Sequence, residues 1–182
     1  MNIDVLQWIE NSREQFWHMD LLAAYGVNDP IAGGVLAFVL GTCFGSFINL
    51  VAHRSLNRES WIHPASHCPQ CKKNIAVWDL VPIVSYMLLK GKCRNCQANI
   101  PFYYPLVELA TGILFVVLLR KYGWSPDGAA MCLFTCTLMA VTVTDFREKL
   151  IPHEITYPAI LIGLTYFAIR HNSIADALIG AG

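Results

Sequence analysis

Charged residues are scarce in this sequence of 182 residues. Asp, Glu, Lys and Arg together make up 14% of it, whereas about 25% is usual in a soluble globular domain. Hydrophobic residues make up 55%, and the mean hydropathy is +0.44. The composition therefore argues against a soluble domain and indicates a chain embedded in a lipid bilayer.

The first residues do not have the pattern expected of a secretory signal peptide. The first 20 residues contain four acidic residues and a single basic one, Arg13, whereas a signal peptide begins with positive charge. Residues 1–30 are therefore interpreted as an acidic N-terminal segment.

Four long runs contain almost no charge. The first, 31–52, has no Asp, Glu, Lys or Arg, and the second, 102–119, is broken only by Glu108. Runs 128–144 and 155–169 are uncharged as well. About 20 apolar residues in a helix, each rising about 1.5 Å, cross a hydrocarbon core of about 30 Å.

We therefore expect an all-α polytopic membrane protein, built as a transmembrane helix bundle. A first transmembrane helix is expected at 31–53, and about three further helices in 102–182. The last residues, 176–182, are typical of the first turns of another helix and lack a charged anchor. We expect the bundle to continue in a longer reading frame.

Lys and Arg gather in one connection. The stretch 53–101 contains seven of them and two acids, a net charge of +5 with His neutral, whereas the residues before the first run carry −4. Lys and Arg in short loops stay on the cytoplasmic side. We therefore expect 54–101 to form a cytoplasmic loop and the N-terminus to lie outside. Arg120 and Lys121 oppose this orientation, but the asymmetry of the first loop is larger.

Two Cys-x2-Cys pairs lie in this loop, Cys68-Pro-Gln-Cys71 and Cys93-Arg-Asn-Cys96. Each pair can present two thiolates from one tight turn, and two facing turns make a tetrahedral all-sulfur site for Zn²⁺. The Lys and Arg residues beside the thiols would favour the thiolate form. Because all four positions are filled by cysteine, the predicted zinc ion is structural.

Other interpretations of the cysteines stay open. Two disulfides would use the same thiols, but structural disulfides are rare in a reducing compartment. Paired spacing disfavours four unrelated thiols, and an iron–sulfur cluster is the alternative metal centre. A zinc-dependent membrane hydrolase is disfavoured because the site is closed and the sequence has no His-Glu-x-x-His. Cys43, Cys132 and Cys136 lie in apolar runs and are interpreted as small buried hydrophobic residues.

Two carboxylates lie where a charge is unfavourable. Asp145 directly follows the third run, where a negative charge opposes the helix macrodipole and lies near lipid. It is a candidate functional residue, and the alternative is a boundary acid paired with Arg147 or Lys149. Glu108 lies inside the second run, where a bond to a neighbouring helix and a place in a polar pocket are both consistent with its position.

The first run has a stripe of small and polar residues at four-residue spacing. Gly41 and Gly45 would let another helix approach closely, and Asn49 and His53 continue the stripe. Helix packing and ligand contact both fit this pattern. Segment 82–89, between the cysteine pairs, is too short to span a membrane; it is expected to pack under the metal site or to lie on the membrane surface.

Four motifs in this order resemble the bacterial prepilin peptidase family. Gly45-Ser-Phe-Ile-Asn-Leu-Val-Ala-His-Arg54 is similar to its Gly-Ser-Phe-x-Asn-Val-x-x-x-Arg signature, and the double Cys-x2-Cys follows at the family's position. Tyr104-Pro-Leu-Val-Glu108 and Thr144-Asp-Phe-Arg-Glu-Lys-Leu-Ile-Pro152 resemble its Tyr-Pro-x-Val-Glu and Asp-x5-hydrophobic-Pro segments.

The resemblance implies two activities in the bacterial inner membrane. Family members cleave the leader from prepilins and pseudopilins on the cytoplasmic side, then methylate the new terminal amine with S-adenosylmethionine. It implies that Asp145 is one of two catalytic aspartates, and that Glu108, Asn49 and Arg54 contribute to the methyltransferase side. Prepilins, pseudopilins and membrane lipid are the expected partners, without nucleic acid; a type IV pilus and a type II secretion system both fit.

The family's second catalytic aspartate lies in a Gly-x-Gly-Asp motif, which these 182 residues do not contain. Two carboxylates that share a proton can act as base and acid on a water molecule, and one carboxylate cannot. The chain is therefore expected to be incomplete as a peptidase. A noncatalytic membrane zinc scaffold in pilus or secretion assembly is the alternative function.

Overall fold

The computed structural model describes residues 29–56, 66–148 and 153–171. The predicted acidic segment, 1–30, lies outside the described residues except for its last two positions, and so do Lys149 and the predicted start of a further helix at 176–182.

Long helices make up most of the described chain. They are α3 (Pro30–Leu56), α5 (Tyr103–Tyr122), α6 (Pro126–Glu148) and α7 (His153–His171). Between α3 and α5 lie a short 3₁₀ helix, η1 (Val77–Leu80), and one turn of helix, α4 (Val84–Leu88). No strand longer than an isolated bridge occurs in the three described ranges. The predicted all-helical fold class is confirmed.

Three helices are long and apolar enough to cross a membrane: Pro30–Ser55, Tyr103–Tyr122 and Pro126–Arg147. The fourth uncharged run, 155–169, lies in α7, whose apolar part is the shorter stretch Ile155–Tyr166. That α7 also spans the membrane stays a prediction.

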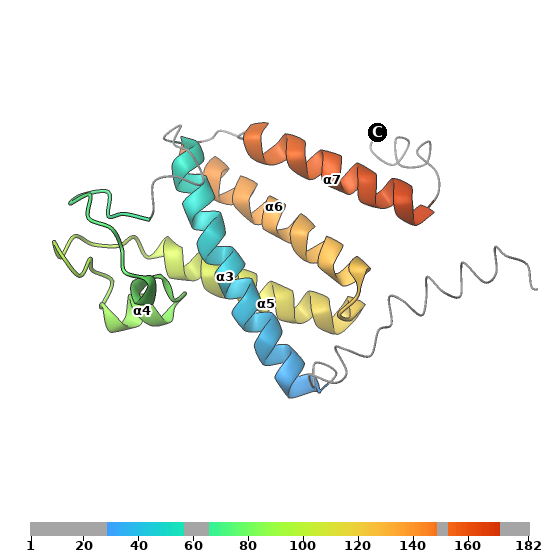
Figure 1. Ribbon diagram of the computed structural model, residues 1–182, viewed down its shortest axis with the longest axis horizontal. Coiled ribbons are helices and arrows are strands. Elements are labelled where there is room, and N and C mark those ends of the chain that lie inside the picture. Colours follow the sequence, from blue (N-terminus) through green and yellow to red (C-terminus); the bar gives the residue numbers. More distant parts are fainter. Residues whose placement is uncertain (1–28, 57–65, 149–152, 172–182) are drawn as a thin grey trace, which may run out of the picture.

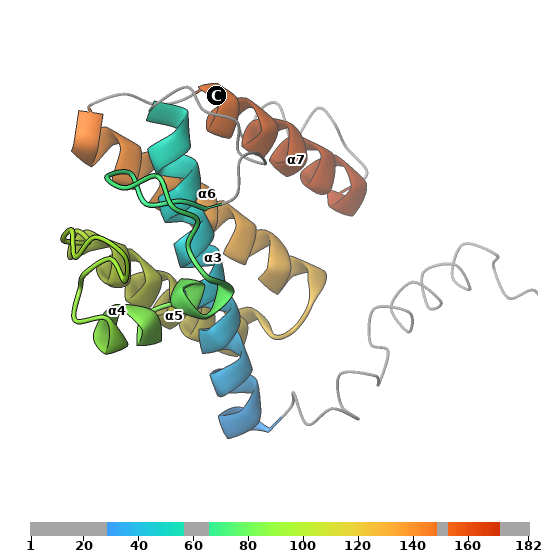
Figure 2. The same ribbon diagram turned by 60° about the vertical axis from the view of Figure 1, so that its left-hand side comes forward.

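The long helices form a crossed bundle with a small module at one end (Figure 1). α3 lies against both α5 and α6, and α7 lies along α6. The module, residues 66–101, projects where α3 ends and α5 begins, and both views place it on the opposite side of the bundle from α7 (Figures 1 and 2).

Small residues set the crossing of α3 and α5. A Cβ atom placed on Gly41 would lie 2.7 Å from the Cα atom of Gly112, and one on Gly45 would lie 2.7 Å from the Cα atom of Glu108. Contacts this close exist only where no side chain separates the two backbones. The predicted close approach along this stripe is therefore confirmed, with α5 as the partner helix.

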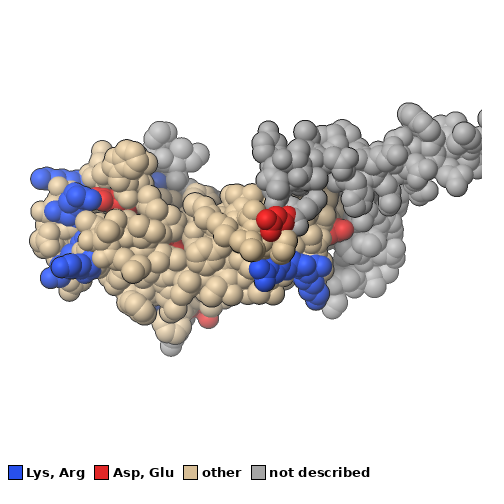
Figure 3. Space-filling view, turned by 90° about the horizontal axis from the view of Figure 1, so that it is seen from below, with Lys and Arg blue, Asp and Glu red and all other residues tan. Residues whose placement is uncertain are grey.

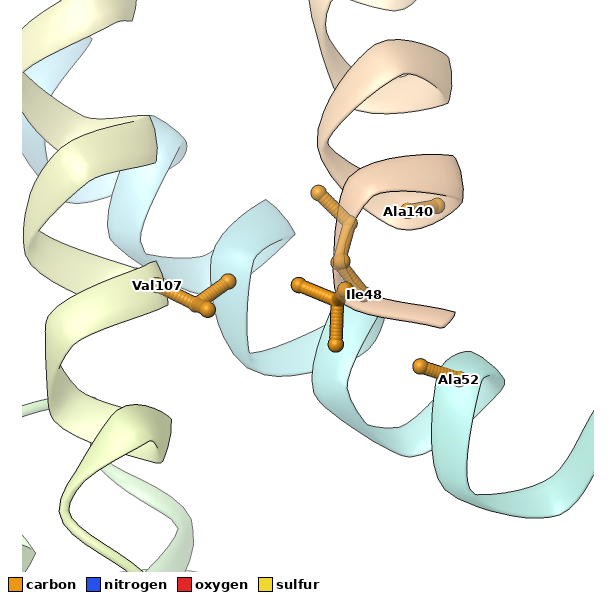
Figure 4. Packing of buried hydrophobic residues seen from close by; sticks show 5 residues of the cluster. Ile48, Ala52, Val107 and Ala140 are labelled. Carbon is orange, nitrogen blue, oxygen red and sulfur yellow. The ribbon is translucent and has the colours of Figure 1, made fainter. Parts of the chain in front are cut away.

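Buried apolar side chains fill the crossing on either side of the glycines. Towards the module, Ile48 and Ala52 of α3 meet Val107 of α5 and Ala140 of α6 (Figure 4). Towards the other end, Ala37, Phe115, Leu119 and Cys132 form a second cluster. Cys132 is buried as expected, but the same expectation is wrong for Cys43, which is exposed on α3. The glycine stripe marks the contact with α5, but apolar residues elsewhere on such a helix do not show whether they face protein or lipid.

A tight turn joins α5 to α6. Gly123 ends α5 with a φ of 72°, a conformation that glycine adopts without strain. The Ser125 hydroxyl then accepts a hydrogen bond from the Gly128 N–H at 3.1 Å, and Pro126 takes the first helical position, where no N–H is needed. These end signals make α5 and α6 antiparallel neighbours.

Replacing Gly45 by Ala should destabilise the bundle, because the new methyl group would overlap the backbone of Glu108. Overpacking of this kind lowers the free energy of unfolding by about 1–3 kcal/mol. Gly163→Ala in α7 is the matched control, since a Cβ atom there has nothing within 4 Å. SDS-induced unfolding in mixed micelles compares the two; equal stability of both variants would contradict the close approach.

Candidate metal centre and adjoining cavity

The first cysteine pair lies in a compact turn. The Lys72 N–H donates to the Cys68 carbonyl at 2.9 Å, and the Cys68 N–H donates to the Lys73 carbonyl at 3.0 Å. Lys72, which directly follows Cys71, has a φ of 57°. A single bridge between His67 and Asn74 closes the base of the turn. This local network holds both thiols on one side of the chain.

The second pair repeats the first, 25 positions later in the sequence. The Gln97 N–H donates to the Cys93 carbonyl at 3.0 Å, and the Cys93 N–H donates to the Ala98 carbonyl at 2.8 Å. Gln97 has a φ of 59°, and a bridge joins Lys92 to Asn99. The two turns are therefore the same structural unit used twice, with Asn-Ile at the end of each.

The four thiols meet at one point. The ligand atoms of Cys68, Cys71, Cys93 and Cys96 all lie within 4.8 Å of one another, and the Sγ atoms of Cys68 and Cys96 are 3.8 Å apart. A tetrahedral ion with metal–sulfur bonds of about 2.3 Å requires sulfur–sulfur separations of about 3.8 Å. A disulfide would need about 2.05 Å, and all four cysteines are free. The site could therefore hold a metal ion.

Backbone amides favour the thiolate form of Cys93. Hydrogen bonds from the N–H groups of Cys96 and Asn95 are the main reason that the pKa of Cys93 is lowered to about 7. A metal ligand must be deprotonated, so these N–H groups prepare the sulfur for binding. The pKa of Cys93 is thus lowered by backbone amides, and not by the neighbouring Lys and Arg side chains as the sequence suggested.

An ion pair ties η1 to the second cysteine turn. The Arg94 guanidinium donates from Nε and Nη2 to the two carboxylate oxygens of Asp79, at 2.8 and 2.6 Å. These bonds hold the pKa of Asp79 below its usual range. The Asp79 side chain is 8% exposed, whereas that of Arg94 is 62% exposed. The exposed guanidinium therefore covers the buried carboxylate at the surface of the module.

Glu108 of α5 connects the bundle to the module. Its buried carboxylate accepts a hydrogen bond from the Ile83 N–H at 2.7 Å, and the Ser46 side chain of α3 is a second partner. Ile83, directly before α4, has a φ of 61° and a ψ of −51°, which is unfavourable for a β-branched residue. The bond from Glu108 fixes the chain in this strained turn.

Polar side chains at the end of α3 are also buried. Asn49, 2% exposed, donates from Nδ2 to the Tyr104 carbonyl at 3.0 Å, and its Oδ1 has no partner among the described residues. Arg54, one turn beyond, is 4% exposed. A buried cation and a buried amide at a helix end are unfavourable unless the surroundings supply polar partners.

A cavity of about 610 Å³ lies between the module and the ends of α3 and α5. Its size is within the range of small-molecule and cofactor sites. Polar lining comes from Ser46, His53 and Arg54 of α3 and from Glu108 of α5, and aromatic lining from Tyr86 and Tyr104. Cys68 and Cys93 form part of the wall, so the metal centre shapes one side of the cavity.

The structure separates the predicted site residues into two groups. Glu108 and Arg54 line the cavity, and Asn49 reaches its border through Tyr104. Asp145 is exposed near the end of α6 and is not part of the cavity wall. No ion pair joins it to Arg147 within the described residues; that guanidinium lies over the Tyr103 ring, 5.6 Å from its centroid.

Sequence reasoning missed Tyr104, Ile83 and the Asp79–Arg94 pair. The repeat of the cysteine turn after 25 residues could have indicated that 76–89 lies close to the metal centre, because this segment connects the two matching turns. The Glu108–Ile83 contact had no sequence signal, since it depends on how α5 meets a strained turn 25 residues earlier in the chain.

Family comparisons match two consecutive parts of the chain. Residues 39–122 match the bacterial peptidase A24 N-terminal domain, and residues 132–182 match the type IV leader peptidase family. No solved structure matches the chain.

Curated relatives have the same name, prepilin leader peptidase/N-methyltransferase. The protein from Myxococcus xanthus (strain DK1622) is 36% identical over 148 residues, covering 81% of this chain and 44% of the relative. The Neisseria gonorrhoeae protein is 36% identical over 155 residues, 72% of this chain and 54% of the relative. The Klebsiella pneumoniae protein is 34% identical over 170 residues, 88% of this chain and 74% of the relative.

The chain belongs to the prepilin leader peptidase/N-methyltransferase family. It spans less than two thirds of the length of the Myxococcus and Neisseria relatives.

The purified chain should bind one tetrahedral metal ion, because the sulfur positions fit one ion and leave no open place. Substitution by Co²⁺ should give a thiolate-to-metal charge-transfer band, and Cys71→Ser should abolish it. Cys43→Ser, which changes an exposed thiol outside the cluster, should leave the band intact. Equal spectra for the two variants would rule out the four-sulfur site.

Proposed function

We propose that this protein cleaves the leader peptide from type IV prepilins and pseudopilins and then methylates the new N-terminal amine. The observation that supports this most directly is the match to relatives of that name across both family domains. The structure is consistent with two separate reaction sites, since Asp145 lies apart from the cavity that Glu108 lines.

Peptide hydrolysis is assigned to Asp145. It is exposed near the end of α6, where a carboxylate can reach water and the polar start of a leader peptide. An aspartic peptidase needs a second carboxylate, so that one acts as base on the attacking water while the other protonates the leaving amine. These 182 residues contain no Gly-x-Gly-Asp, and they are not expected to cleave a prepilin alone.

Methyl transfer is assigned to the cavity beside the cysteines. When bound, S-adenosylmethionine supplies an electrophilic methyl group. The Glu108 carboxylate would attract the positively charged groups of the reactants, and Arg54 is suited to a carboxylate. Asn49 holds the Tyr104 backbone at the wall and so acts on the shape of the cavity rather than on the reactants.

The metal centre is assigned to structural Zn²⁺. Four thiolates suit zinc, and a closed four-sulfur site leaves no position for a reacting water. Its role would be to hold the cavity wall that contains Cys68 and Cys93. The excess of Lys and Arg in 53–101 supports a cytoplasmic module and a multi-pass protein of the bacterial inner membrane.

Asp145→Asn in the full reading frame should stop leader removal, with a rate loss of about 10²–10⁴-fold, because an amide cannot exchange the proton. Asp127→Asn is the control at the other end of α6, where the carboxylate accepts a hydrogen bond from Tyr166. The intact mass of a co-expressed prepilin reports cleavage. Normal processing by Asp145→Asn would refute the assignment, and cleavage by residues 1–182 alone would place the partner carboxylate within them.

Glu108→Gln should slow methylation of a pre-cleaved pilin peptide about 10- to 100-fold while leader removal continues, since a hydrogen bond to a charged group contributes about 1.5–3 kcal/mol. The glutamine oxygen can still accept from the Ile83 N–H, so the module should stay in place. Glu108→Ala removes the charge and the anchor together, and should also weaken metal retention. Full methylation by Glu108→Gln would show that the charge is not needed.

The noncatalytic scaffold remains the second candidate, favoured by the closed metal site. Absence of both leader removal and methylation from the unsubstituted full-length protein, with metal retained, would support it.

A further inference from the structure

The segment between the cysteine turns has two different faces. Asp79, Pro82, Ser85, Tyr86 and Leu89 turn inwards and line the cavity. A second set of side chains points away from the protein. This outward set, here called the docking face, consists of Val77, Trp78, Val81, Val84, Met87 and Leu88.

Every residue of the docking face is apolar and exposed. Trp78 is 82% exposed, Leu88 77%, Val77 76% and Met87 71%. Single apolar residues are common on soluble surfaces, but six exposed apolar side chains within the segment 77–88 indicate an interaction surface. The docking face is therefore expected to be covered in the native setting.

The charge around the docking face identifies what covers it. Within the module, Lys72, Lys73, Lys90, Lys92 and Arg94 are all exposed, and Figure 3 shows Lys and Arg gathered at this end of the molecule. The one carboxylate of 66–101, Asp79, is paired with Arg94. An apolar face on a module with several exposed Lys and Arg residues complements a bilayer surface that contains anionic lipid.

The helix that carries part of the docking face, α4, also contacts the residue before the membrane-spanning helix α5. Phe102, 69% exposed, directly precedes α5 and packs edge-on against Tyr86 of α4, with ring centroids 6.5 Å apart. The candidate membrane-spanning helix that follows the module, α5, begins at Tyr103. The ring contact places α4 beside the start of a helix that is long and apolar enough to cross a membrane. We therefore expect α4 near the depth where headgroups meet acyl chains.

We propose that the docking face inserts into the interface of the leaflet on the module's side, with the module's exposed Lys and Arg residues bound to anionic headgroups. The module is then a monotopic element that lies on the membrane, and its cavity opens beside the bilayer surface. The proposal rests on the spanning helices and the exposed face, and on neither enzymatic activity. The sequence leaves two positions open for 82–89, under the metal site or on the membrane surface. The proposal selects the membrane surface.

The test uses Trp78 as a reporter in the full chain reconstituted in nanodiscs. Replacing Trp8, Trp17, Trp61 and Trp124 by Phe leaves Trp78 as the single tryptophan among these 182 residues, and any tryptophan beyond them is replaced in the same way. Lipids brominated near the headgroup should quench its emission, and acrylamide in the water should not. A second reporter, Met87→Trp with Trp78→Phe, examines the same face independently, and Tyr86→Trp, which points into the cavity, is the unquenched control.

Charge is tested by comparing anionic with zwitterionic nanodiscs. Lipid quenching should be stronger with anionic lipid, and Gln at Lys72, Lys73, Lys90 and Lys92 should reduce the quenched fraction about twofold or more. Quenching by acrylamide without quenching by lipid would overturn the proposal, because the face would lie in water. Protection from both quenchers would also overturn it, in favour of a protein partner such as the prepilin substrate.

Discussion

The contact between α3 and α5 at Gly45 determines where every other part of the site can lie. A glycine at this position lets the backbone of Glu108 approach α3 directly, and this places the carboxylate beside Ser46 and in reach of the Ile83 N–H. With any larger residue the two helices would separate, and the carboxylate would leave the turn that it stabilises. One missing side chain in the bundle thus fixes the position of a module built from a different stretch of the chain.

Burial of a charge and strain of the backbone offset each other at this contact. A carboxylate inside an apolar helix pair is unfavourable without a donor, and Ile83 with positive φ is unfavourable without an anchor. The Ile83 N–H supplies the donor that the carboxylate needs, and the Glu108 carboxylate supplies the anchor that the strained turn needs. The same reasoning applies to Asn49, whose amide group is directed at the Tyr104 carbonyl, a backbone group next to Pro105 in the first turn of α5. Both contacts join elements that are far apart in sequence, and they hold Glu108 and Tyr104, which are part of the cavity wall.

Local rules predicted the helices and the cysteine centre, because uncharged runs and paired cysteines act over short distances. The runs gave the positions of α3, α5 and α6 to within a few residues, and the four thiols do meet. The glycine stripe indicated the side of α3 that contacts α5, but Cys43 was wrongly expected to be buried, because its apolar neighbours do not distinguish lipid from protein. The cavity was out of reach for another reason, since its walls depend on the strained turn at Ile83 and on the Asp79–Arg94 pair.

A metal ion bound by both cysteine turns would act as a cross-link in the chain. A single ion shared by both turns would close the 21 residues between Cys71 and Cys93 into a ring, and ring closure removes conformational freedom from a chain before any side chain packs. Within this ring, Asp79 is tethered to Arg94 and Ile83 to Glu108. A stretch with no hydrophobic core of its own is thereby kept in one shape by its cross-links, which leaves its apolar side chains available for contacts outside the protein.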